Sequence, residues 1–473
     1  MKTISAILFA VLCLLASAPT SFTRPARAAA PARTAAIVDG TQISQTASAE
    51  VEAVYPEAYS LYLDIHEHPE LSGEETQTAA KLATRLRTLG YEVTEHVGGT
   101  GIVAIMRNGD GPTIMLRTEL DALPVEEKTG LPYASKVHAK DPSGVDVPVM
   151  HACGHDLHMA ALYGTAAIMA RSKDTWHGTL MLIGQPAEET ITGAKAMLDD
   201  GLLTRFQRPD AGVALHVSNG LPAGEVGAPS GYFTASADSL RVTIYGKGAH
   251  GAAPEDSIDP VVIAARTVVA LQTIVSREVT PGQPAVVTVG YIHAGTKNNI
   301  IPDHAELGLT VRTYSPAVRK QVLAAIARIV KGEAEAAGAQ RPPEIDHYEA
   351  TDALYDDPLL AKRLTPVLAT ALGEQNVKPI RPVMASEDYS YFVEAGIPSF
   401  FYSLGGADPE KYAEAKKSGI PLPSNHSPLF APDAPPALRI AITSEVAALR
   451  NLLSGSAEVL RKSLAGEAGP PQS

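Results

Sequence analysis

The chain has 473 residues, of which 45% are hydrophobic and 19% are charged, so it is long enough for two globular domains. Its formal net charge of −13 argues against nucleic acid or an anionic membrane surface as a partner, because both would repel it. Of its two cysteines, Cys13 falls in a segment that we expect to be removed, so Cys153 is not expected to form a disulfide.

The N-terminal residues 1–30 have the features of an export signal. Lys2 supplies a positive charge, residues 4–15 form an apolar core too short to span a bilayer comfortably, and small residues follow. We therefore expect a periplasmic or secreted protein without a stable membrane anchor, an uncleaved anchor being the alternative. No other segment is expected to cross a membrane. Residues 31–48 are a predicted linker, and residues 456–473 are a predicted flexible tail.

Helical and extended patterns alternate through the first half of the chain. Ser72 and Glu75 resemble a capping box, and residues 108–111 resemble a hairpin turn. Alternating strands and helices predict an α/β sheet with helices on both faces. The predicted helices cover residues 51–63, 72–89, 158–170 and 194–200, and the predicted strands cover residues 102–106, 113–116, 180–183 and 211–217.

The pattern changes near residue 233 and returns after residue 352. Between these points the predicted order is β-α-β-β-α-β, that of a ferredoxin-like α+β unit. We therefore predict one α/β domain in two pieces, residues 49–232 and 351–455, with a smaller domain inserted at residues 233–350. The elements predicted in the insert are strands at residues 240–245, 285–292, 305–314 and 343–348, and helices at residues 260–277 and 317–337.

A thiol, three imidazoles and a carboxylate fall within residues 151–158, around a glycine. These donors suit a transition metal such as zinc or manganese. Cys153 and His155 alternate, so in an extended loop both can face one ion. His151 and His158 are alternatives to these ligands, or else hydrogen-bond partners or helix caps.

More polar side chains follow predicted strands, at the edge of an α/β sheet where ligands bind. Glu119 and Asp121 follow one strand, and Asp121 could fix the tautomer of a ligand histidine. Glu188 and Glu189 follow the next strand, where one carboxylate can bind a cation while its neighbour takes a proton from water. His216 ends the strand after that.

Two clusters occur late in the chain. Asn425 and His426 lie in a loop, and the acidic pair Glu387 and Asp388 is either a helix start or a wall of the site. Together the clusters predict two divalent cations that share a bridging group, with Glu188 free as the base. The predicted ligands are Cys153, His155, Glu189, His216 and His426.

In this combination and order, the motifs resemble those of the aminoacylase/carboxypeptidase metallopeptidase family. The amidohydrolase branch with hippurate hydrolase and auxin–amino acid conjugate hydrolases is the most similar. The resemblance spans about residues 55–452 and rests on residues 66–71, 117–124, 151–158, 184–189, 215–217 and 425–428. It implies a zinc-peptidase-like mixed sheet and hydrolysis of N-acyl amino acids. A dipeptidase or metallocarboxypeptidase is the alternative.

The resemblance also implies roles for individual residues. It implies that two metal ions are bound by the same five ligands. The ions would be zinc or manganese, with cobalt or nickel as alternatives. It also implies that Glu188 is the general acid/base. The inserted unit would be a lid or dimerisation domain. There, His250 is expected to hold the substrate or the tetrahedral intermediate, often from the partner subunit of a dimer. Asn299 and Arg312 are expected to bind the substrate carboxylate, for which a guanidinium fork is suited.

Two features depart from this family pattern. Glu119 stands where the branch usually has Asp, which changes the hydrogen bonding around the ligands without removing one. Residues 407–422 resemble an insert before His426 and are expected to reshape the pocket wall. The preferred acyl group and amino acid therefore cannot be copied from a relative.

Two other classes of protein remain as alternatives. A cysteine hydrolase would use Cys153 as its nucleophile, and alkylation under saturating metal separates the two readings because a ligand thiolate is shielded. A non-catalytic metal or peptide receptor would keep the fold. Glu188 argues against it, because a receptor needs no base.

Overall fold

The computed structural model describes residues 40–465. The expected export signal, residues 1–30, and the last residues of the chain lie outside this range. Helix α1 (Gly40–Glu67) begins inside the predicted linker, so the linker prediction is wrong for its second half. The small and polar residues there indicated a loose segment, but Ala and Gln among them also favour helix.

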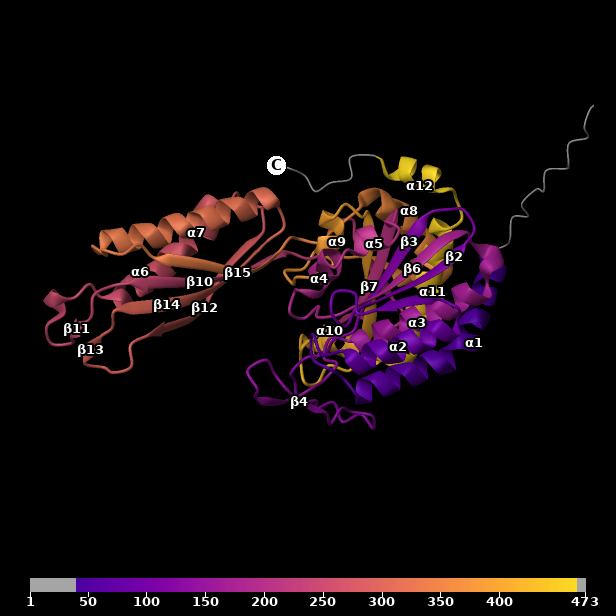
Figure 1. Cartoon of the computed structure of the whole chain (residues 1–473), viewed down its shortest axis with the longest axis horizontal. Helices are drawn as coiled ribbons and strands as arrows, with labels where there is room; N and C mark the ends of the chain where they lie inside the picture. The colour runs from indigo at the N-terminus through magenta and orange to yellow at the C-terminus, as the bar shows by residue number, and fades with distance from the viewer. Residues whose placement is uncertain (1–39, 466–473) are drawn as a thin grey trace, which may run out of the picture. The chain divides into compact units, whose positions relative to one another are not determined.

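An eight-stranded mixed sheet forms the main part of the described chain (Figure 1), with strand order β1-β2-β6-β3-β7-β18-β8-β17. Strand β3 is parallel to β6 and β7, and β7 is parallel to β18, whereas β2 is antiparallel to β6. The strands are β1 (Glu92–Glu95), β2 (Ile102–Asn108), β3 (Thr113–Glu119), β6 (Gly178–Gln185), β7 (Ala211–Pro222), β8 (Val226–Ala228), β17 (Val377–Pro379) and β18 (Ser399–Ala407).

The predicted hairpin at residues 108–111 is wrong. Strand β6 lies between β2 and β3, pairing Ile102 with Gly184 on one side and Thr113 with Thr179 on the other. A turn signal shows that the chain reverses, but not whether a later strand enters between the two arms. On its other side, β2 pairs antiparallel with β1, a strand that the apolar pattern did not predict.

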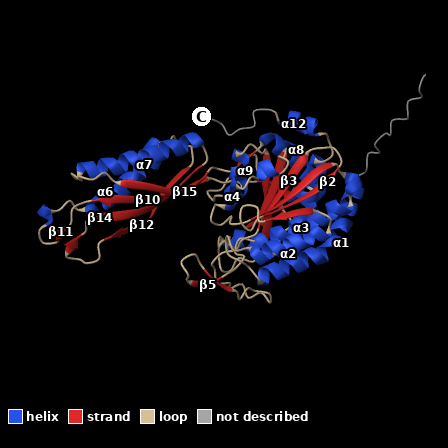
Figure 2. Cartoon of the chain, viewed as in Figure 1, coloured by secondary structure: helices blue, strands red, loops and turns tan. Residues whose placement is uncertain are grey.

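Helices cover both faces of this sheet (Figure 2), as predicted. Strand residues alternate between two apolar cores: Leu116 and Val213 face one, and Met115 and Ala214 face the other. Period-two alternation is what a sheet buried on both faces requires. The first core contains α1, α2 (Thr76–Thr88), α3 (His155–Arg171), α8 (Pro358–Leu372) and α11 (Ala434–Leu452), and the second contains α4 (Gly193–Asp199), α5 (Leu202–Arg205) and α9 (Ser390–Glu394).

A second, antiparallel sheet has its own apolar core and the strand order β12-β14-β10-β15. Its elements follow one another as β10-α6-β12-β14-α7-β15, which confirms the predicted order, while the exact domain boundaries stay a prediction. The elements are β10 (Ser236–Tyr245), α6 (Pro260–Thr273) with a π-helical turn (Ile274–Glu278), β12 (Ala285–Ala294), β14 (His304–Thr313), α7 (Pro316–Ala336) and β15 (Glu344–Thr351).

By length and composition alone, the segment Pro260–Glu278 is apolar enough to cross a membrane. The expectation that no segment after the export signal is apolar enough to do so is therefore wrong. The same length and composition occur in helices that pack inside proteins or at their interfaces.

The smaller elements are β4 (His138–Lys140) with β5 (Asp146–Pro148), β9 (Gly231–Tyr232) with β16 (Tyr355–Asp356), β11 (Ala249–His250) with β13 (Ile300–Ile301), and α10 (Pro409–Ser418).

The predicted flexible tail, residues 456–473, is also partly wrong. Helix α12 (Ala457–Leu464) occupies its first half, and the Ser456 side chain accepts a hydrogen bond from the backbone N–H of Val459. Leu460 and Leu464 are buried. Their i,i+4 spacing gives one apolar helix face, a signal that the polar composition of the tail obscured.

The predicted capping box does not form either. Glu75 is the N-cap residue of α2, but its side chain caps no helical N–H. The Glu75 carboxylate instead accepts from the backbone N–H of Ala187 at 2.8 Å, and Ser72 Oγ donates to Asp121 Oδ2 at 2.7 Å. Both side chains therefore hold loops that follow β3 and β6, where the predicted site residues lie.

Candidate metal centre

The predicted site residues meet at the carboxyl ends of parallel strands. Asp121 follows β3, Glu188 and Glu189 follow β6, and His216 lies in β7. Parallel strands bring the loops that follow them to one edge of the sheet, which is why residues far apart in the sequence lie together there.

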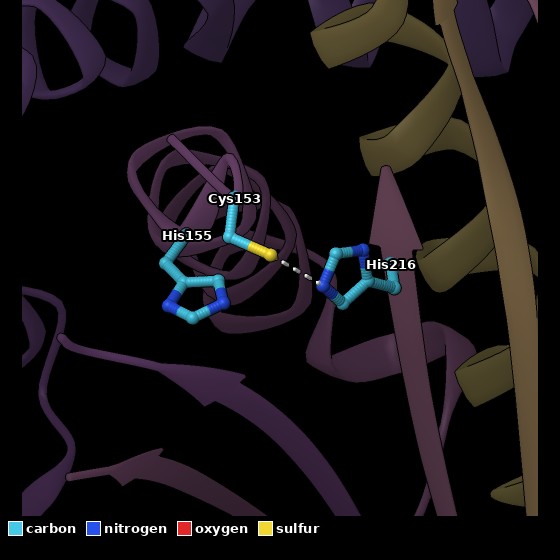
Figure 3. Close-up of side chains that lie close together, drawn as sticks. All are labelled: Cys153, His155 and His216. Atoms are coloured by element: carbon cyan, nitrogen blue, oxygen red, sulfur yellow. Dashed lines mark hydrogen bonds between the residues drawn. The ribbon is translucent and has the colours of Figure 1, made fainter. Parts of the chain in front are cut away.

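Cys153 and His155 enter the site from the start of α3, on either side of Gly154. Gly154 has a φ of +88°, and a Cβ atom there would lie 2.3 Å from Val217 Cγ1. Only glycine fits this backbone, because it tolerates the left-handed region and leaves room for the neighbouring strand. Figure 3 shows the Cys153 thiol pointing toward the His216 ring, with 3.4 Å between Sγ and Nε2.

The five predicted ligands form two groups of three that share one thiol. The ligand atoms of Cys153, His155 and His216 lie within 4.8 Å of one another, and those of Cys153, Glu189 and His426 do so as well. His426 Nε2 is 3.3 Å from the Cys153 sulfur and 3.2 Å from Glu189 Oε2. This arrangement fits two cations bridged by a thiolate.

The buried atoms of the site also fit a cation. Among the described residues, His155 Nε2 and Glu189 Oε1 are buried without a hydrogen-bond partner, 3.9 Å apart. His155 Nδ1 lies 2.8 Å from the Asp121 carbonyl oxygen and 3.3 Å from Asp121 Oδ1, so the main-chain oxygen makes the closer contact rather than the predicted carboxylate. Burial opposes a positive charge on the ring, but Asp121 and Glu119 raise the pKa of His155 to about 10. The surroundings therefore favour positive charge, and a divalent cation would satisfy both unpaired atoms.

His216 and His426 are positioned by the main chain around them. His216 Nδ1 donates to the carbonyl oxygen of Val217 at 2.9 Å, which leaves Nε2 facing Cys153. Burial lowers the pKa of His216 to about 3, so the ring is neutral, as a ligand must be. His426 has a φ of +70°, a conformation rare for a side-chain-bearing residue and typical of functional sites.

Glu188 lies beside the ligands. Its side chain is almost fully buried, and Oε2 is 3.9 Å from His155 Nε2. Burial and the negative charges of Glu387 and Glu189 raise the pKa of Glu188 well above its usual value. A carboxyl group in such surroundings can exchange protons near neutral pH.

The surroundings of Cys153 do not favour a nucleophilic thiol. Burial, with the charges of Glu189 and Glu188, raises the pKa of the Cys153 thiol well above its usual value. A reactive cysteine needs positive neighbours that stabilise the thiolate. Cys153 therefore fits a metal ligand better than a nucleophile.

His158 has no ring nitrogen free to bind a cation. Both nitrogens of His158 are engaged, Nδ1 with Glu119 Oε2 at 2.9 Å and Nε2 with the backbone N–H of Val217 at 2.9 Å. His151 is buried, and burial lowers its pKa to about 4. Of the two alternatives left open by the sequence, His158 is a hydrogen-bond partner rather than a ligand.

A buried ionic network behind the site was missed from the sequence. The Arg117 guanidinium is fully buried and pairs with Glu119, with Glu387 Oε1 at 2.8 Å and with Asp388 Oδ1 at 3.3 Å. It also donates to Gln185 Oε1 at 2.9 Å. The arginine directly follows a predicted strand, and nothing local in the sequence indicates carboxylates that come from a loop some 270 residues later.

A cavity of about 800 Å³ opens next to the ligands. Arg312 lines it, half-buried, and donates to Ser386 Oγ at 2.7 Å. Of the acidic pair, Glu387 lines the cavity and Asp388 does not, so only Glu387 is a wall of the site. Contrary to expectation, residues 407–422 do not line this cavity. Tyr412 contacts its wall indirectly, because its hydroxyl donates to the carbonyl oxygen of the lining residue Gly220. The larger apolar lining residues of the cavity include Ile191, Leu221, Phe233, Ile380, Val383, Met384 and Phe401.

His250 and Asn299 lie apart from the ligands of this chain. They belong to the β11–β13 region, where Gly251 N–H donates to the Asn299 carbonyl oxygen at 2.8 Å. Both are exposed, and neither lines the cavity described above. Within one chain, the structure brings these two residues together but not to the site.

Comparisons with known proteins give one family. A family model described as Peptidase family M20/M25/M40 matches residues 115–420. Hippurate hydrolase of Campylobacter jejuni is 39% identical over 343 residues, covering 70% of this chain and 83% of that protein. Thermostable carboxypeptidase 1 of Saccharolobus solfataricus is 36% identical over 375 residues, covering 78% and 88%. The crystal structure of a dinuclear metal binding peptidase from Bacillus subtilis matches with a TM-score of 0.68 and 30% identity, covering 85% of this chain and 99% of that one.

Proposed function

Because the chain belongs to peptidase family M20/M25/M40, we propose that it is a metal-dependent amidohydrolase that cleaves the amide bond of N-acyl amino acids. The observation that carries this proposal is the pair of three-ligand groups joined at Cys153, with Glu188 beside them. The mixed sulfur, nitrogen and oxygen donors suit zinc or manganese, and also cobalt or nickel.

Two divalent ions in such a site polarise the amide carbonyl and lower the pKa of water. The protein side chains do the remaining work. Glu188 accepts the proton of the attacking water and passes it to the leaving amine, a role that suits its raised pKa. Asp121 holds Nδ1 of His155, so that Nε2 points into the site.

The cavity supports an N-acyl amino acid as the substrate. Its apolar lining, which includes Phe233 and Ile380, suits an acyl group, and Arg312 suits the substrate carboxylate. We assign Asn299 to the same carboxylate only in an assembled dimer, because it lies apart from the cavity of its own chain.

We propose that two copies associate through the four-stranded sheet. Strand β12 is an edge of that sheet, and Ile292 on it is 47% exposed. On α6, Val262 and Val269 are 54% and 72% exposed. An open edge and an apolar helix face are typical of surfaces that pair with a second copy. In such a dimer, His250 of the partner subunit would complete the site.

This assembly is tested by light scattering after size exclusion. Replacing both Val262 and Val269 with Glu should give a monomer. As a matched control, Val459→Glu changes an equally exposed valine on α12 and should leave the dimer intact. A monomeric wild type would refute the assembly.

We also propose export, which rests on residues 1–30 alone. The mature N-terminus of protein from a fractionated cell should lie beyond this segment, in the periplasmic or secreted fraction. Mature protein in the cytoplasm would refute export.

A dipeptidase or carboxypeptidase remains the second candidate. The similarity to thermostable carboxypeptidase 1 favours it, since that protein is as similar in sequence as the hippurate hydrolase. Both reactions cleave an amide bond, so they differ in what occupies the apolar side of the cavity.

The proposed function is tested by loading the protein with Zn²⁺ or Mn²⁺ and assaying hippurate, N-acetyl amino acids and dipeptides. We expect N-acyl amino acids to be the better substrates and chelation to abolish turnover. Hydrolysis of dipeptides alone would favour the second candidate. Turnover that survives chelation but is lost on alkylation of Cys153 would instead identify a cysteine hydrolase.

A further inference from the structure

The main chain of Val217 is held at both its N–H and its carbonyl oxygen. Its N–H donates to His158 Nε2 at 2.9 Å, and its carbonyl oxygen accepts from His216 Nδ1 at 2.9 Å and from Asn425 Nδ2 at 3.1 Å. The direction of the His216 ring therefore depends on where the main chain of Val217 lies. The remaining nitrogen of that ring, Nε2, is the atom that faces Cys153.

His158 can accept from Val217 in one protonation state only. Nε2 must carry a lone pair, so the proton of the neutral ring is on Nδ1, where it donates to Glu119 Oε2 at 2.9 Å. The ring is 2% exposed, so these two protein partners fix the donor and acceptor roles of its nitrogens. Glu119 thus fixes the tautomer that Val217 needs.

Glu119 is fixed in turn by Arg117. One carboxylate oxygen pairs with the buried guanidinium, and the other accepts from His158. Arg117 is itself anchored on Glu387, at 2.8 Å. A neutral side chain at position 119 has a single acceptor oxygen and cannot serve both partners.

We propose that Arg117, Glu119 and His158 form a positioning relay that aims His216 Nε2 and so sets the affinity for one of the two ions. This inference rests on the proposed function. The ion affected is the one held by His216, together with Cys153 and His155. The relay contacts neither Glu189 nor His426, so it leaves the other ion unaffected.

The test is a titration of metal-free protein with Zn²⁺, followed by competition with a chromogenic chelator. The wild type should bind two ions per chain. In Glu119→Gln, one of the two affinities should fall about 10- to 100-fold, the usual effect of removing a partner of a metal ligand, while the other stays unchanged. The readout is binding, so it does not depend on turnover.

A second pair of variants separates positioning from loss of packing. His158→Gln keeps one donor and one acceptor, so it should retain more of the affected affinity than His158→Leu, which keeps neither. Glu445→Gln is the matched control. Glu445 is as buried as Glu119 and accepts from Thr165 Oγ1 at 2.6 Å, outside the relay. Its variant should bind both ions like the wild type.

Two results would overturn the relay alone: unchanged binding of both ions in Glu119→Gln and His158→Leu, or an equal loss at both ions. A general structural role would produce the second result, together with a lower unfolding midpoint of the metal-free variants. A wild type that binds no Zn²⁺ would refute the proposed function and the relay together.

Discussion

Replacing Arg117 with Met should destabilise the protein strongly. The Arg117 side chain is fully buried and faces three carboxylates, those of Glu119, Glu387 and Asp388. Methionine keeps most of the volume but removes the only cation in this group. Removing one partner of a buried ion pair costs about 3–5 kcal/mol, because the remaining charge stays desolvated.

The cost should depend on pH. Without Arg117, the buried carboxylates of Glu387 and Asp388 can take up protons instead; even beside Arg117, burial raises the pKa of Asp388 to about 8. Carboxyl groups whose folded-state pKa lies above the unfolded value bind more protons when folded, so the variant regains stability as the pH falls toward 5. The difference from the wild type should therefore be larger at pH 8 than at pH 5.

The assay is urea unfolding of the metal-free protein, followed by the fluorescence of Trp176, the only tryptophan, which is buried in the main core. Arg107→Met is the matched control on β2 of the same sheet, because Arg107 pairs with Glu92 at 2.7 Å with both side chains more than half exposed. An exposed pair contributes about 1 kcal/mol or less. An Arg117→Met variant within about 1 kcal/mol of the wild type at pH 8 would refute the reasoning.

Three further changes have definite expected outcomes. Glu188→Gln should still bind both ions but lose about 10²- to 10⁴-fold in kcat, and normal turnover would exclude Glu188 as the base. Gly154→Ala should lower the free energy of unfolding by at least about 1–2 kcal/mol and weaken metal binding, because the new methyl group would clash with Val217. A urea midpoint equal to that of the wild type would contradict this. Burial opposes the charge on His66, but Asp156 and Glu127 raise the pKa of His66 to about 10. The loss of stability in His66→Gln should therefore be largest below about pH 6.5 and shrink as the pH approaches 10. A loss of stability that does not change with pH would contradict this.

Most elements of the fold could be predicted because burial leaves a periodic record. The strands of the main sheet are buried on both faces and read as short apolar runs, as Leu180–Ile183 within β6 illustrates. The pairing of those strands could not be predicted. The insertion of β6 between β2 and β3 depends on a crossover through α3, which no local pattern specifies.

The candidate ligands could be predicted because their side chains are few, chemically distinctive and placed after strands. The groups that hold them could not. Arg117 and Glu387 are ordinary charged residues in the sequence, and only the fold brings them together in a buried site. Likewise, Ser72 and Glu75 have the spacing of a helix cap, but tertiary contacts with Asp121 and Ala187 prevail over that local role.

The central claim is that Cys153 bridges two ions. Anomalous scattering from crystals grown with Zn²⁺ tests it most directly. We expect two peaks about 3.5–4 Å apart, each about 2.3 Å from the Cys153 sulfur, one beside His155 and His216 and the other beside Glu189 and His426. A single peak, or two peaks of which only one contacts that sulfur, would contradict the account.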